Sequence, residues 1–211
     1  CIAYTPQEVH VLKAAGKKAI MLGVENGYAI GKDIENITRF RKMGVSYITL
    51  CHNGSNDICD SARGDAEWNG LSPFGKEVVR KMNETGVLVD ISHAAESTFY
   101  DALETSTYPI IASPSSARAF CNHPRNLTDA QIKEMVRRGC LIGLNYYGVF
   151  LRDDGDVRSL DDLYRHIAHF FDLGAQKSLA LGSDFDGADL PDCLSSPEKV
   201  AAVYDYLLSR G

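Results

Sequence analysis

The chain has 211 residues, of which 45% are hydrophobic and 24% are charged. These proportions are typical of a folded globular protein and exclude a disordered or fibrous one. The formal net charge of −6 is unfavourable for binding nucleic acid or an anionic membrane, so a small molecule is the expected partner. The length predicts a single domain over residues 1–211.

Cysteine usage and hydropathy give two further expectations. The cysteines are widely spaced and contain no CxxC pair, which predicts mostly reduced thiols. No apolar run reaches the roughly 18 to 20 residues that span a bilayer, and no basic-then-apolar leader opens the chain. We therefore expect a cytoplasmic location, although export stays open because a removed leader would leave no trace.

Helix and strand signals alternate through the first half of the chain. Thr5-Pro6-Gln7-Glu8 combines a capping hydroxyl, a proline at the first helical position and a reciprocal glutamate, and Gly16 ends this helix. Short apolar runs predict strands, whereas apolar residues at helical spacing predict helices. We expect strands at residues 19–24, 45–50 and 87–91, and helices at residues 33–43, 72–86 and 96–105.

The second half repeats the pattern. Thr128 and Gln131 predict a capping box, as do Ser159 and Asp162, and Gly174 ends the second of these helices. Strands are expected at residues 109–112, 141–144 and 178–182, with a last helix beginning near Ser196. Six strands that alternate with seven helices, without an intervening linker, predict a parallel sheet covered by helices.

The expected fold class is therefore α/β, and two architectures fit the pattern. A closed (β/α)₈ TIM-type barrel has eight strands and typically about 250 residues. Its first and last strands would then lie before Cys1 and after Gly211. An open doubly wound sheet needs no missing strand. In both architectures the functional site forms where the carboxyl ends of the strands meet.

Polar side chains stand at five of the six predicted strand ends, and the remaining strand is followed by Pro114-Ser115-Ser116. Carboxylates and imidazoles gathered at one edge suit a metal or acid–base site. Singly, each also has a structural interpretation, as a capping carboxylate, a core histidine or a turn residue. The five residues are Glu25, His52, His93, Asn145 and Asp184.

Other motifs narrow the chemistry. Arg125, in a loop after the fourth predicted strand, is either a surface charge or a group that would bind a carboxylate through two hydrogen bonds. Cys51 beside His52 is a weak signal for thiol catalysis, because adjacent strand residues point to opposite faces. The sequence contains no phosphate-binding loop, dinucleotide fingerprint or Gly-x-Ser-x-Gly elbow.

Five short motifs occur in order along nearly the whole chain: GVENG at 23–27, GLSPFG at 70–75, VDISH at 89–93, PRNL at 124–127 and GSDFDG at 182–187. Together they resemble the membrane (renal) dipeptidase family of the amidohydrolase superfamily. The resemblance implies a (β/α)₈ barrel that binds two zinc ions, bridged by a glutamate and by a water or hydroxide, and hydrolyses dipeptides. It also suggests a homodimer.

The resemblance further implies a role for each candidate residue. Glu25 matches the bridging carboxylate and His93 matches a ligand of the second zinc. His52 matches a residue that steadies the substrate carbonyl or its oxyanion. Arg125 matches the group that binds the C-terminal carboxylate of the dipeptide, and Asp184 matches the acid–base carboxylate.

Two departures from the family pattern leave alternatives open. The sequence lacks the His-x-Asp pair that the family has on its first strand, and Pro114 stands where the family has a histidine ligand. Proline offers no imidazole or other side-chain ligand atom, so His123 or Ser115 would have to replace it, and the chain would hold two, one or no zinc ions. The alternatives are a non-catalytic relative that binds a peptide or amino acid, and a hydrolase of another small amide.

Overall fold

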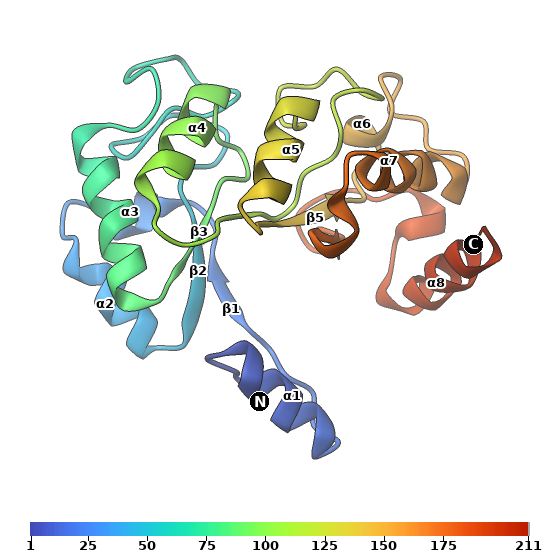
Figure 1. Ribbon diagram of the computed structural model, residues 1–211, viewed down its shortest axis with the longest axis horizontal. Coiled ribbons are helices and arrows are strands. Elements are labelled where there is room, and N and C mark those ends of the chain that lie inside the picture. The colour runs from blue at the N-terminus through green and yellow to red at the C-terminus, as the bar shows by residue number, and fades with distance from the viewer. Residues whose placement is uncertain (211) are drawn as a thin grey trace. The chain divides into compact units, whose positions relative to one another are not determined.

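The structure is a computed structural model that describes residues 1–210. It divides into two compact units, one formed by residues 1–110 and one that begins at Ile111. Parallel strands alternate with helices in both units, as the sequence predicts (Figure 1). The expectation of a single domain stays a prediction.

The first unit contains three parallel strands, paired in chain order. They are β1 (Leu22–Val24), β2 (Val45–Thr49) and β3 (Leu88–Asp90). The helices of this unit are α1 (Pro6–Ala14), the 3₁₀ helix η1 (Gly27–Ile30), α2 (Glu35–Lys42), α3 (Pro73–Thr85) and α4 (Glu96–Thr105).

The second unit also contains three parallel strands in chain order, β4 (Ile111–Ala112), β5 (Leu141–Asn145) and β6 (Leu179–Gly182). Its helices are α5 (Asp129–Arg137), α6 (Gly148–Leu151), α7 (Leu160–Asp172), η2 (Ala175–Lys177), η3 (Asp192–Leu194), η4 (Pro197–Lys199) and α8 (Val200–Ser209). Strand triplets of this order occur in the barrel and in the doubly wound sheet alike.

Apolar side chains from helices and strands form the core of each unit. In the first unit, Ile37 of α2 and Val78 of α3 are fully buried, as is Ile48 of β2. In the second unit, Ile132 of α5 and Leu144 of β5 are fully buried as well. The helices therefore cover the strands with the apolar faces that the sequence periodicity predicts. Across residues 1–210, helices of the length and apolar character needed to cross a membrane are absent.

The elements differ from the predictions at several places. Helix α6 is not predicted, because four residues are too few to show a helical period. Strand β1 begins at Leu22, since Ile20 forms only an isolated bridge with Ile2. Strand β4 has two residues, although four were expected. Helix α8 begins at Val200, and the turn after Ser196 is a 3₁₀ helix.

The two predicted capping boxes have different outcomes. Thr128 and Gln131 form both bonds of the box, so this prediction is confirmed. The box of Ser159 and Asp162 is wrong: the Ser159 hydroxyl accepts from the amide of Asp161, and the Asp162 carboxylate accepts from the amide of Arg158. The Asp162 carboxylate also pairs with Arg152 at 3.0 Å. A nearby guanidinium is a stronger partner for a carboxylate than a neutral amide.

His166 of α7 is fully buried and uses both ring nitrogens. The amide of Ala117 donates to its Nδ1 at 3.1 Å, so the other ring nitrogen carries the hydrogen and donates to the carbonyl of Leu151 at 3.0 Å. Burial lowers the pKa of His166 from 6.5 to about 4. The folded state therefore holds this imidazole neutral.

This burial predicts a pH dependence of stability. As pH falls from about 6.5 to about 4, His166 becomes protonated in the unfolded chain but stays neutral in the folded protein, so the free energy of unfolding decreases. Denaturant unfolding at pH 7 and pH 4 should show that wild type loses about 3 kcal/mol more than His166→Gln. His10→Gln, at an exposed position, is the matched control. Equal losses in wild type and His166→Gln would contradict the prediction.

Candidate metal centre

Three strand ends of the first unit bring a carboxylate and two imidazoles together. Glu25 follows β1 directly, and His52 and His93 each stand three residues beyond the ends of β2 and β3. Their potential ligand atoms all lie within 4.8 Å of one another. Glu25 Oε1 is 3.3 Å from His93 Nε2 and 3.8 Å from His52 Nε2, and the two imidazole centroids are 4.2 Å apart.

The three side chains differ in their access to solvent. The side chain of His93 is 10% exposed, whereas those of His52 and Glu25 are 43% and 60% exposed. The cluster is therefore closed on the His93 side and open on the others. Two imidazole nitrogens and a carboxylate oxygen are a donor set that zinc binds in proteins. The residues present thus fit a zinc ion, and the open sides leave room for a substrate.

A buried carboxylate directs His93 into the cluster. Asp90, at the end of β3, is fully buried and accepts from the amide of Ser92 at 3.0 Å and from the hydroxyl of Thr49 at 2.7 Å. The backbone of His93 has a φ of 68°, which is rare for a side chain other than glycine, and its carbonyl accepts from the amide of Ala62 at 2.7 Å. This tight turn holds the imidazole toward Glu25.

The sequence motifs assign Asp90 no role of its own. Its signal was a carboxylate at the end of an apolar strand, three residues before a histidine. In the structure, hydrogen bonds to the Asp90 carboxylate connect the strand β2 to the turn that carries His93. Asp90 is therefore a positioning residue for the cluster.

The end of β1 is shaped by contact between Gly23 and Tyr47. A Cβ atom at Gly23 would overlap the phenol ring of Tyr47, so the ring lies directly against the glycine backbone. Burial, followed by the negative charges of Asp90 and Glu25, raises the pKa of Tyr47. The phenol therefore stays neutral beside the cluster. Its ring packs against β1, the strand that precedes Glu25.

Arg125 lies in the second unit and is 5% exposed, so its interpretation as a surface charge is wrong. Its guanidinium carbon is 5.3 Å from the centre of the Phe150 ring, and its amide donates to Nδ1 of His123 at 3.1 Å. The side chain of Asn126 donates to the carbonyls of Cys121 and Phe150, both at 2.9 Å. These bonds fix the loop against α6 and keep the guanidinium on an aromatic surface.

Asp184, also in the second unit, lies in a turn, and its acid–base role stays a prediction. Its φ is 65° and its carbonyl accepts from the amide of Gly187 at 3.1 Å, as in a turn. A Cβ atom at Gly187 would overlap the Asp184 carboxylate, so glycine leaves space for that carboxylate to lie across the turn. Asn145 is fully buried and accepts from the amide of Tyr147, which gives it a structural role.

The structure thus brings Glu25, His52 and His93 into one cluster in the first unit, whereas Asn145, Asp184 and Arg125 lie in the second unit. Parallel strands whose carboxyl ends carry a zinc-type cluster are typical of metal-dependent hydrolases on barrel folds. The model of the membrane dipeptidase family (peptidase family M19) matches residues 1–211, and the chain therefore belongs to this family.

Curated relatives include proteins that are named dipeptidases. Dipeptidase tcpJ of Claviceps purpurea is 33% identical over 216 residues, which cover 100% of this chain and 50% of the relative. An uncharacterized dipeptidase of Schizosaccharomyces pombe is 34% identical over 194 residues, which cover 90% of this chain and 47% of the relative. The chain spans about half the length of the curated relatives that it matches.

Solved structures agree with this assignment. A metallopeptidase from Rhodobacter sphaeroides, liganded with a phosphinate mimic of the dipeptide L-Ala-D-Ala, has a TM-score of 0.94 at 26% identity, and the match covers 100% of this chain and 62% of the other. An amidohydrolase from Pseudomonas aeruginosa, at 23% identity, has a TM-score of 0.92 over 100% of this chain and 72% of the other, and supports the fold alone. The predicted family is confirmed, and the α/β fold is consistent with part of a TIM-like barrel.

The contact between Gly23 and Tyr47 predicts a mutational effect. Gly23→Ala should lower the free energy of unfolding by about 1–3 kcal/mol, because the new methyl group overlaps the ring. Gly54→Ala, where a Cβ atom meets nothing within 4 Å, is the matched control. The cost should shrink in a Tyr47→Leu background, which a double-mutant cycle from denaturant unfolding would measure. Additive effects of the two changes would show that the contact is not the cause.

Proposed function

We propose that this chain is part of a zinc-dependent dipeptidase built on a (β/α)₈ barrel. The observation that carries the proposal is the cluster of Glu25, His52 and His93 at the strand ends of a chain that belongs to the membrane dipeptidase family. The dipeptide mimic bound by the Rhodobacter sphaeroides relative supports dipeptides as substrates. The greater length of the relatives supports additional barrel strands outside these 211 residues.

Glu25 and His93 are the zinc ligands in this proposal. Glu25 presents two carboxylate oxygens at the open side of the cluster, which suits a ligand that bridges two ions. His93 presents Nε2 from the closed side, 3.3 Å from Glu25 Oε1. Bound zinc would supply a Lewis acid that lowers the pKa of a water ligand and polarises a carbonyl group.

His52 has two roles open to it, since it also lies within ligand distance of the cluster. We assign it to the substrate carbonyl, because its Nε2 is farther from Glu25 than that of His93 and its side chain is more exposed. A ring N–H that donates to the carbonyl oxygen stabilises the negative charge that develops there when the amide is attacked.

Asp184 and Arg125 complete the chemistry. Asp184 would accept a proton from the attacking water and deliver it to the leaving amine, the task of a positioned general base and acid. Arg125 would bind the C-terminal carboxylate of the substrate through two hydrogen bonds, which are strong where solvent is excluded. Recognition of a free carboxylate next to the scissile bond restricts the enzyme to dipeptides.

Pro114 favours a second candidate function. It follows β4 at the position of a family ligand and offers no side-chain ligand atom. The Nδ1 of its possible replacement, His123, accepts from the amide of Arg125, so only Nε2 of that ring could take the place of the ligand. A protein that binds one zinc ion or none would be a non-catalytic relative that holds a peptide or amino acid. Zinc content and dipeptide turnover of the full-length protein separate the two functions: turnover supports the dipeptidase, and its absence after zinc loading overturns it.

Zinc binding should depend on Glu25 and His93 but not on His52. After zinc loading and removal of free metal, elemental analysis should show less zinc in Glu25→Gln and His93→Ala than in wild type. His52→Ala should retain its zinc and lose about 10²- to 10³-fold in kcat, because a donor to the oxyanion is removed. His10→Ala is the control. Loss of zinc from His52→Ala would instead make His52 a ligand.

Arg125 should determine the preference for a free carboxylate. Arg125→Lys should raise KM for a dipeptide by about tenfold, because a lysine cannot make the paired hydrogen bonds of a guanidinium. The corresponding dipeptide amide lacks that carboxylate, so it should be a much poorer substrate and should be cleaved at the same low rate by wild type and variant. Steady-state kinetics on both substrates test this. A similar loss on the amide would show that Arg125 acts through the fold and not through the carboxylate.

A further inference from the structure

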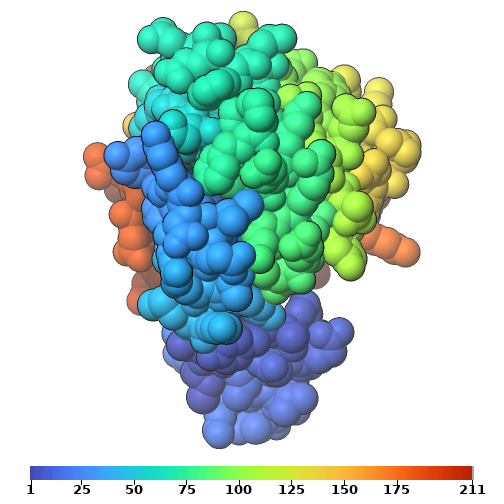
Figure 2. All heavy atoms as spheres, turned by 90° about the vertical axis from the view of Figure 1, so that its left-hand side faces the viewer, coloured from blue at the N-terminus to red at the C-terminus, as the bar shows by residue number. Residues whose placement is uncertain are grey.

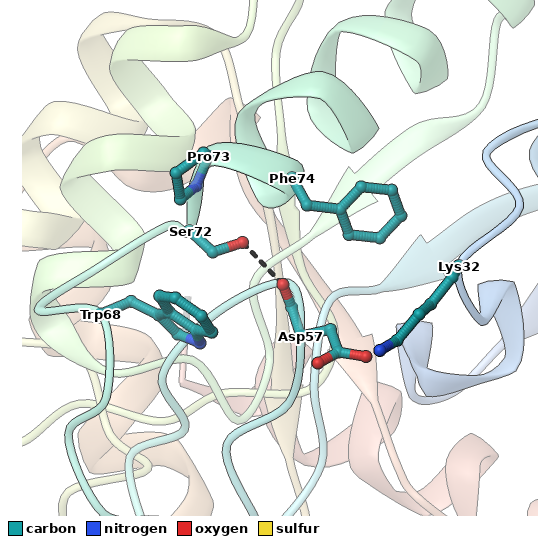
Figure 3. Close-up of a pocket in the computed structure, with 6 residues that line it drawn as sticks. All are labelled: Lys32, Asp57, Trp68, Ser72, Pro73 and Phe74. Carbon is teal, nitrogen blue, oxygen red and sulfur yellow. Dashed lines mark hydrogen bonds between the residues drawn. The ribbon is translucent and has the colours of Figure 1, made fainter.

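A cavity of about 400 Å³ lies beside the beginning of α3 (Figure 3). It shares no lining residue with the cluster of Glu25, His52 and His93. A second cavity of about 280 Å³ adjoins it and shares Lys32 and Asp57 as lining residues. The larger cavity is lined by Lys32, Asp57, Trp68, Ser72, Pro73 and Phe74.

The lining divides into an apolar part and a charged part. Trp68, Pro73 and Phe74 present two aromatic rings and a pyrrolidine ring to the cavity. Asp57 and Lys32 contribute one negative and one positive charge, and Figure 3 shows their charged ends directed toward each other. Exposed opposite charges attract each other only weakly through water, so both remain available to a ligand.

The tryptophan is held in place before any ligand binds. Its indole N–H donates to the carbonyl of Asn56 at 2.9 Å, and its amide donates to the Asp60 carboxylate at 3.1 Å. Asp60 is 2% exposed and also accepts from the amides of Glu67 and Gly70. The Trp68 side chain nevertheless remains 41% exposed. A ring that is already ordered loses little entropy when a ligand packs on it.

The backbone of Asp57 is fixed as well. Its carbonyl accepts from the hydroxyl of Ser72 at 2.6 Å, the dashed line in Figure 3. The side chain of Asn56 accepts from the amides of Ile58 and Cys59 at 2.8 and 3.1 Å, which forms a tight turn around Asp57. The acidic group of the cavity therefore projects from an ordered loop.

We propose that this cavity binds a free α-amino acid with an apolar side chain. The α-ammonium group would lie beside Asp57, the α-carboxylate beside Lys32, and the side chain against Trp68 and Phe74. One acidic and one basic group match a zwitterion of zero net charge, and a volume of about 400 Å³ suits a small ligand. The site needs no turnover, so the inference stands apart from the proposed function. Dipeptide cleavage, as proposed above, would release this class of molecule.

The ligand can be followed through one signal, because Trp68 is the only tryptophan of the chain. Titration of the full chain with L-leucine should shift the indole ¹H–¹⁵N resonance of Trp68 until it saturates, with a Kd of about 1 mM. L-Leucinamide lacks the carboxylate and N-acetyl-L-leucine lacks the ammonium group. Each should bind about three- to fivefold more weakly than leucine. A titration without saturation overturns the proposal.

Two variants assign the charges to their partners. Asp57→Asn should weaken the binding of leucine by about three- to fivefold and leave the binding of N-acetyl-L-leucine unchanged. Lys32→Met should weaken the binding of leucine by a similar factor and leave the binding of L-leucinamide unchanged. Lys76→Met and Glu77→Gln, at exposed positions of α3, are the matched controls. Equal effects on leucine and both analogues would overturn the proposed orientation.

One further variant separates this cavity from the cluster. Glu25→Gln should bind leucine as wild type does, whatever its zinc content and catalytic activity. Loss of the Trp68 shift in Glu25→Gln would place the ligand in the cluster and overturn the proposal. Failure of the protein to cleave dipeptides would leave the leucine titration unaffected, so the two proposals fail separately.

Discussion

Strands β1, β2 and β3 pair in parallel, so their carboxyl ends all lie at the same edge of the sheet. The cluster of the first unit follows from this alignment. Glu25, His52 and His93 are separated by 27 and 41 positions in the sequence, yet their ligand atoms lie within 4.8 Å. The helices between the strands occupy the flanks and leave that edge to the loops.

Hydrogen bonds to buried carboxylates order the loops of the first unit. Asp90 joins β2 to the turn that carries His93, and Asp60 accepts three backbone amides from the loop that carries Trp68. A carboxylate that is buried away from water needs hydrogen-bond donors in place of water, and a loop can supply its backbone amides. The same type of interaction thus supports the candidate metal centre and the proposed amino-acid site.

The second unit uses a different means to order its charged groups. Arg125 is nearly excluded from solvent and lies on the ring of Phe150, while Asn126 connects its loop to α6. A guanidinium tolerates burial on an aromatic face because its charge is delocalised and weakly hydrated. Asp184 reaches its position through a backbone of positive φ, a conformation that His93 and Asn26 share. Such conformations recur at functional sites, where the surrounding fold maintains them.

By itself, the sequence determined the alternation of strands and helices, the family, and the candidate residues at the strand ends. Apolar periodicity and capping residues are local, and motifs such as VDISH and GSDFDG can be read without knowing what lies beside them. The one-turn helix α6 is not predicted because its segment is too short to show a helical period. The ion pair of Asp162 with Arg152 is not predicted because it joins residues from different segments of the chain. Only the tertiary structure decided that Arg125 is buried, that Asp90 positions His93, and that Trp68 and Asp57 share a cavity. These are contacts between segments, and their free energy depends on which groups the fold removes from water together.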